Sequence, residues 1–217
     1  MIVMHEHYSR PNNDVALVKM EEAIPLGDFI KPICFPTTDK FDYSLWKGCY
    51  VTGWGLQEEY GKVAPVLQQA ALTLIPSDVC RKREVYGDSI TENMICAGYI
   101  SGGIDACQGD SGGPLSCHPE STDNYFLIGI VSWGEGCGQA FKPGVYTLTS
   151  KYVDWVQRHV TLAGESQVTN LETPVKNEPV YVPACDEAVT FRNLNTCFEY
   201  LIFVFSCICI ILQGYLV

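Results

Sequence analysis

Short apolar runs separated by turn-forming residues fill most of the chain. The runs are rich in Val, Ile, Leu and Tyr, and clusters of Gly, Pro, Asn and Asp fall between them. This spacing is typical of the short strands of a barrel or sandwich. The pattern therefore predicts an all-β fold over residues 1–160. The clearest expected strands are Val15–Val18, Cys49–Thr52, Ala71–Ile75, Phe126–Val131 and Val145–Leu148.

The spacing of apolar residues changes after the last of these strands. Between Tyr152 and Val160 they recur at helical intervals, which predicts a short amphipathic helix over residues 151–160. Residues 161–199 are polar, with three prolines and six acidic against two basic side chains. Such a composition cannot bury a core, so this segment is predicted to be a stalk or linker.

Residues 200–217 are almost wholly apolar, and between Leu201 and Leu212 only Ser206 carries a polar side chain. A membrane-spanning helix needs about 20 apolar residues, and a cleaved glycolipid-anchor signal has a tail of about 10–20 residues after a polar spacer. We expect membrane attachment through this tail, as an anchor signal or a span. A buried C-terminus is the remaining alternative.

Charge and cysteine content narrow the partners and the compartment. The net charge is −11, with 14 basic against 25 acidic residues, and an acidic chain repels nucleic acid. The 11 cysteines are widely spaced and include no Cys-x-x-Cys pair. This favours disulfides in an oxidising compartment over a metal site. We therefore expect an extracellular or cell-surface protein without nucleic-acid partner, metal or cofactor.

The first residues do not resemble a secretory signal, because His5-Glu6-His7 interrupts a very short apolar start. The cysteines nevertheless indicate secretion. This conflict suggests that Met1 is not the natural beginning of the fold.

The candidate chemistry lies in Gly109-Asp110-Ser111-Gly112-Gly113-Pro114. Glycines beside the serine let the backbone turn sharply and approach a substrate closely. The amides of Gly109 and Ser111 would then form an oxyanion hole. The motif is not Gly-x-Ser-x-Gly and no strand–helix alternation surrounds it, which disfavours an α/β-hydrolase.

Several segments in the same order resemble the chymotrypsin-fold, trypsin-like serine proteases. Residues 105–115 resemble the nucleophile segment, and residues 13–19 resemble the strand that follows the catalytic aspartate. Residues 49–55 resemble the first strand of the second barrel, whereas residues 131–134 and 142–147 resemble the pocket walls. The similarity covers residues 1–160. It implies a double β-barrel with a C-terminal helix, in which the second barrel (46–150) is complete and the first is largely missing.

The resemblance assigns roles to individual residues. Ser111 would be the nucleophile and Asp14 the aspartate that orients the catalytic histidine. Asp105 would lie at the base of the primary specificity pocket, where a buried carboxylate needs an Arg or Lys of the substrate as its partner. This implies cleavage of proteins or peptides after Arg or Lys through an acyl-enzyme. The other pocket residues implied are Ser132, Trp133, Gly134, Gly136 and Gly144.

The resemblance also implies a set of disulfides. In many two-chain members of the family, the cysteine that Cys34 resembles bridges to a light chain, so a longer form could carry one. Cys185 and Cys197 could pair in the stalk, and the tail holds Cys207 and Cys209. The implied pairs are Cys49–Cys117, Cys80–Cys96 and Cys107–Cys137.

The chain departs from the family at the general base. The family's catalytic histidine lies in an Ala-Ala-His-Cys context, which is absent here. Without a base, a serine hydroxyl is a poor nucleophile. The sequence also has no Ile-Val-Gly-Gly-like start whose amine would pair with Asp110. The histidines present are His5, His7, His118 and His159.

Two functions follow from these departures. The first is a membrane-anchored trypsin-like endopeptidase, of which this chain is a truncated or alternative form that is inactive as given. The second is a non-catalytic surface protein that keeps the pocket to bind basic peptide segments. A further alternative is that His5 or His7 acts as the general base in place of the family's catalytic histidine.

Overall fold

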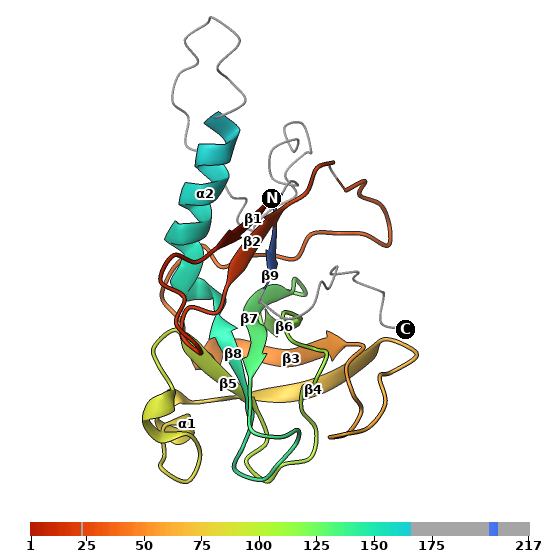
Figure 1. Ribbon diagram of the computed structural model, residues 1–217, viewed down its shortest axis with the longest axis vertical. Helices are drawn as coiled ribbons and strands as arrows, with labels where there is room; N and C mark the ends of the chain where they lie inside the picture. Colours follow the sequence, from red (N-terminus) through yellow and green to blue (C-terminus); the bar gives the residue numbers. More distant parts are fainter. Residues whose placement is uncertain (23, 166–199, 204–217) are drawn as a thin grey trace, which may run out of the picture.

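A closed antiparallel β-barrel forms the centre of the computed structural model, which describes residues 1–22, 24–165 and 200–203 (Figure 1). Its strand order is β3-β4-β5-β8-β7-β6, and the ring closes because β3 also pairs with β6. Closure leaves none of these strands with an open edge. The strands are β3 (Trp46–Gly53), β4 (Gln68–Ile75), β5 (Met94–Gly98), β6 (Pro114–Pro119), β7 (Phe126–Trp133) and β8 (Gly144–Leu148).

The all-β fold class predicted from the sequence is confirmed, but two barrel strands were not among the clearest predictions. Every residue of β5 is buried, and its short run of Met, Ile, Cys, Ala and Gly has no alternation of apolar and polar positions. Strand β6 begins and ends with proline, and proline within a run argues against a central strand. Each of the two strands also pairs with a strand that is distant in the sequence, β5 with β8 and β6 with β3.

A small three-stranded sheet lies above the barrel in Figure 1, with the order β1-β2-β9. It contains β1 (Ile2–Met4), β2 (Ala16–Lys19) and β9 (Tyr200–Phe203). Leu17 of β2 is opposite Val3 on one side and Ile202 on the other. The pairing of β9 was not predicted, because residues 200–203 belong to the predicted tail. The rest of that tail and residues 166–199 lie outside the described residues.

Helix α2 (Val153–Glu165) packs against both the small sheet and the barrel. A short 3₁₀ turn, η3 (Thr149–Tyr152), precedes it, and the helix extends five residues beyond the predicted end at residue 160. Trp155 packs in one buried cluster with Leu17 of β2 and Ile130 of β7, and its indole N–H donates to the Glu6 carboxylate at 2.7 Å. No helix in the described ranges is long and apolar enough for a membrane crossing. The remaining short helices are η1 (Tyr43–Leu45), α1 (Ser77–Cys80) and η2 (Gly87–Ser89).

Gly129 packs closely against side chains of the barrel core, and this gives a stability prediction. A Cβ at this position would lie 2.9 Å from Cβ of Tyr146 and 3.2 Å from Cδ2 of Leu115. Overpacking of this kind costs about 1–3 kcal/mol. We therefore expect Gly129→Ala to lower the thermal midpoint by about 5 °C. Gly27→Ala is the control, because no atom lies within 4 Å of its added Cβ; equal midpoints for the two variants would contradict this packing.

Candidate active site

Two backbone hydrogen bonds hold the segment around Ser111 against the end of β7. The N–H of Gly112 donates to the carbonyl of Val131 at 2.9 Å, and the N–H of Val131 donates to the carbonyl of Gly113 at 2.9 Å. Ser111 is half-buried. This pairing places the predicted nucleophile beside Ser132, the residue that follows Val131.

The amides predicted to form an oxyanion hole are available as donors. Gly109 has φ +98°, a conformation that favours glycine, and a Cβ there would lie 3.1 Å from Cα of Gly55. Within the described part of the chain, neither the N–H of Gly109 nor that of Ser111 donates a hydrogen bond. Both can therefore donate to an oxygen of a substrate.

Asp110 is held by backbone amides. Its Oδ1 accepts from the N–H of Gly55 at 2.8 Å, and its Oδ2 accepts from the N–H of Cys107 at 3.0 Å. A side chain at Gly53 or Gly55 would overlap the Asp110 carboxylate. The sequence predicted that Asp110 would lack its partner, an N-terminal amine. In the structure, the carboxylate instead accepts hydrogen bonds from the two neutral backbone amides of Gly55 and Cys107.

Asp14 lies just before β2 and reaches the same end of β7. The hydroxyl of Ser132 donates to Oδ2 of Asp14 at 2.6 Å, and the hydroxyl of Thr147 donates to the Asp14 carbonyl at 2.7 Å. Burial raises the pKa of the Asp14 carboxyl above its ordinary value, and the hydrogen bond from Ser132 partly offsets this. Ser132 therefore links the predicted aspartate to the strand end that holds Ser111.

The histidines lie elsewhere. In the described residues, no histidine forms a hydrogen bond with Asp14 or with Ser111. His5 packs edge-on against Tyr152 at 5.4 Å between ring centroids, and burial lowers its pKa. His118 and His159 have ring contacts with Tyr125 and Trp155, respectively.

Asp105 lies at the base of the predicted specificity pocket. Its Oδ1 accepts from the N–H of Ala106 at 2.8 Å, and its Oδ2 accepts from the N–H of Gly138 at 3.2 Å. Burial raises the pKa of this carboxyl to about 6, although these backbone donors oppose the rise. No Lys or Arg in the described residues forms an ion pair with it. The carboxylate thus has only neutral partners.

Two glycines of the predicted pocket walls lie near Asp105 and Tyr86. A Cβ on Gly144 would lie 2.7 Å from Oδ1 of Asp105, so a side chain there would overlap the carboxylate. At Gly134 the nearest atom to an added Cβ is the Tyr86 hydroxyl, 3.8 Å away. Among the described residues the Tyr146 hydroxyl has no hydrogen-bond partner; it is fully buried and lies 3.1 Å from the position of an added Cβ on Gly144.

A comparison with known protein families matches residues 1–156 to the trypsin family. This match spans well over half of the chain. The chain belongs to the trypsin family. It is therefore a serine protease by family, and the resemblance noted from its sequence is confirmed.

Two residues of this candidate site were not singled out from the sequence, Tyr146 and Tyr86. Tyr146 lies inside a segment that resembles the pocket wall, so that resemblance could have identified it. Tyr86 supports the wall from a distant loop: its hydroxyl donates to the Pro143 carbonyl at 2.8 Å, and its ring packs against Trp133 at 4.8 Å between centroids. Only the folded chain shows the approach of Tyr86.

Disulfides fix the loops of this trypsin-family chain. Cys107–Cys137 joins the loop that carries Asp105 to the loop that carries Gly136. Cys34 also takes part in a disulfide, and the predicted light chain remains a prediction. The structure contains the same pairs that the resemblance implies, namely Cys49–Cys117, Cys80–Cys96 and Cys107–Cys137.

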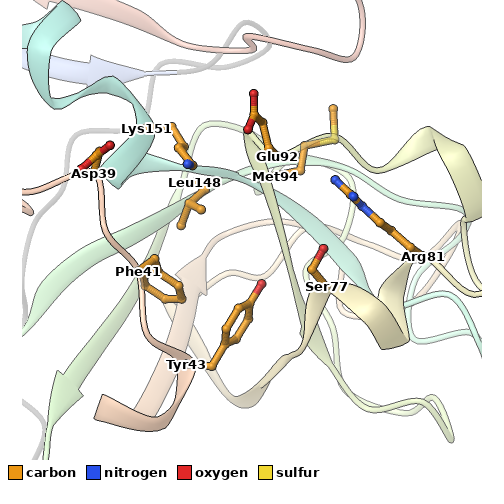
Figure 2. A pocket seen from close by; sticks show the side chains of 9 residues that line it. All are labelled: Asp39, Phe41, Tyr43, Ser77, Arg81, Glu92, Met94, Leu148 and Lys151. Atoms are coloured by element: carbon orange, nitrogen blue, oxygen red, sulfur yellow. The ribbon is translucent and has the colours of Figure 1, made fainter.

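A separate cavity of about 300 Å³ lies at the other end of β8 (Figure 2). Gly144 at the start of this strand borders Asp105, whereas Leu148 at its end lines the cavity. None of the predicted site residues borders it, so it is distinct from the protease site. In the described ranges, no group of three metal-ligating side chains could hold a metal ion. The residues that line the cavity are Asp39, Phe41, Tyr43, Ser77, Arg81, Glu92, Met94, Leu148 and Lys151.

Proposed function

We propose that the site belongs to a serine endopeptidase that cleaves proteins after Arg or Lys. The observation that carries this proposal is the largely buried Asp105 carboxylate, whose hydrogen-bond partners among the described residues are neutral and which lies beside Gly144 close to the Tyr146 hydroxyl. A buried carboxylate without a cation is unfavourable. A substrate guanidinium or ammonium group would supply the missing charge.

Acyl transfer would use residues of the segment before β6, which lies beside the end of β7. The Ser111 hydroxyl oxygen would attack the substrate carbonyl carbon, and the amides of Gly109 and Ser111 would stabilise the resulting oxyanion. The hydroxyl proton must pass to a base and then to the leaving amine. In the family this base is a histidine oriented by the aspartate. Here the Asp14 carboxylate accepts a hydrogen bond from Ser132, and no histidine among the described residues donates to it.

In the proposed site, Asp105 would bind the substrate, and no histidine of the described residues forms a hydrogen bond with Ser111 or Asp14. This favours the second candidate, a surface protein that binds basic segments without cleaving them, as the behaviour of this form. A serine-directed phosphonate separates the two. Rapid labelling of Ser111 would count against the non-catalytic form, whereas labelling no faster than that of free serine would support it.

The raised pKa of Asp105 gives a pH prediction for ligand binding. A cation binds the ionised carboxylate, and the pKa of this carboxyl is about 6. Protonation on acidification removes the charge, so benzamidine should bind about tenfold more weakly at pH 5 than at pH 7. Calorimetric titration at both pH values measures this. Affinity that stays constant, or that improves on acidification, would show that Asp105 does not hold the cation.

We also propose that the chain acts at the extracellular surface. The disulfides support an oxidising compartment. Membrane attachment through residues 200–217 remains a prediction. Fractionation of cells that express the full chain tests both, and recovery in the soluble cytosolic fraction would contradict them.

A further inference from the structure

A short hairpin, residues 56–63, lies beside the segment that leads to Ser111. Leu56 donates its N–H to the carbonyl of Gln108 at 2.9 Å and bridges to Val63 across the hairpin. At the tip, the N–H of Gly61 donates to the carbonyl of Glu58 at 2.9 Å, and Tyr60 has φ +62°. These bonds fix the tip relative to the pocket entrance.

Glu59, at this tip, touches the outside of the pocket wall. Its Oε2 accepts from the side-chain amide of Gln139 at 3.0 Å and lies 2.9 Å from the position of an added Cβ on Gly136. In the same wall, the N–H of Gly138 donates to Asp105 at 3.2 Å. The loop 136–139 therefore has one carboxylate on its pocket side and a second at its rim.

The charge of Glu59 is uncompensated among the described residues. Its hydrogen-bond partner is a neutral amide, and no Lys or Arg there forms an ion pair with it. Glu135, also beside the pocket wall, differs because Lys142 neutralises it at 2.8 Å. Tyr146, close to Asp105, has a fully buried hydroxyl with no hydrogen-bond partner in the described part of the chain. A ligand held by Asp105 would thus pass close to a second negative charge.

We propose that Glu59 determines specificity by binding a second cation of the substrate. The preferred substrates are protein segments that carry another Arg or Lys within a few residues of the one held by Asp105. This inference rests on the proposed Arg/Lys pocket. Glu59 lies at the rim in contact with water. Its attraction for the second cation should therefore mainly raise the association rate of the substrate, and this effect should weaken at high salt.

Peptide binding tests the proposal, with the full chain carrying Ser111→Ala so that peptides stay intact. One set of peptides has a single Arg, and a second set adds another Arg at each position from four before to four after it. We expect one or more positions to bind about fivefold tighter than the single-Arg peptide at low salt. Glu59→Gln should abolish that gain, because the amide keeps the size of the side chain and removes its charge.

Glu58→Gln is the matched control, since Glu58 is the neighbouring exposed acid on the same hairpin. It should retain the gain, and about 0.5 M salt should remove the gain from the parent chain. If the single-Arg peptide binds but no second Arg adds affinity, or if the gain survives Glu59→Gln, the role of Glu59 is refuted while the pocket stands. If no Arg peptide binds, the Asp105 pocket itself is refuted.

Discussion

Replacing Asp105 with Asn is expected to weaken the binding of benzamidine by about a hundredfold or more. Truncating one partner of a buried, hydrogen-bonded charge pair costs about 2–5 kcal/mol, and each 1.4 kcal/mol is about tenfold in affinity. Asp105 fits this case because it is largely buried, accepts two backbone hydrogen bonds and has no cation of its own among the described residues. Asn has nearly the same shape without the charge, so the loss reports electrostatics.

Calorimetric titration of both proteins with benzamidine at pH 7.5 measures this difference. Asp123→Asn serves as the control, because it removes one exposed acid and so tests the effect of overall charge. Thermal unfolding of each variant shows whether the fold is retained. Affinity within threefold of the parent for the folded Asp105→Asn protein would exclude Asp105 as the primary cation site.

The second expected result concerns turnover. The chain should hydrolyse an arginyl amide no faster than its Ser111→Ala variant, a deficit of about a millionfold relative to an intact triad. The prediction rests on the proposed lack of a proton acceptor: in the described region no histidine forms a hydrogen bond with Ser111 or Asp14, and His5, His118 and His159 contact aromatic rings. Release of a chromophoric amine over several days provides the sensitivity needed.

Turnover that depends on Ser111 would contradict this prediction. His5→Gln and His7→Gln would then show whether an N-terminal histidine acts as the base. The structure argues against this role for His5, since its ring packs on Tyr152 and burial lowers its pKa. A loss of rate in either variant would nevertheless assign the base directly.

Local patterns predicted much of the fold, because alternation and turn residues act over a few positions. Strands β7 and β8 were found in this way, and the end of α2 was missed by five residues. The pairing of β9 with β2 was not predicted. An apolar tail has the same composition whether it enters a membrane, leaves with an anchor signal or pairs with a sheet.

The candidate site shows the same division. Ser111, Asp14 and Asp105 were singled out because each lies in a short segment that resembles the family. The hydrogen bond between the side chains of Ser132 and Asp14 depends on the tertiary fold, because the two residues are 118 positions apart in the sequence. The same is true of the backbone donors that hold Asp110 and of the Glu59 contact with the wall. Sequence segments thus identify the groups, and only the fold shows which partners each one has.

We propose that this trypsin-family chain binds a basic side chain beside Asp105 but lacks the base needed for cleavage. The most direct measurement is a single incubation of the full chain with an excess of a peptide that contains one Arg. Bound peptide is quantified by calorimetry, and the recovered peptide is analysed by mass spectrometry. We predict saturable binding at pH 7.5 with the peptide recovered intact. Absence of binding, or cleavage after the Arg that disappears in Ser111→Ala, would contradict the claim.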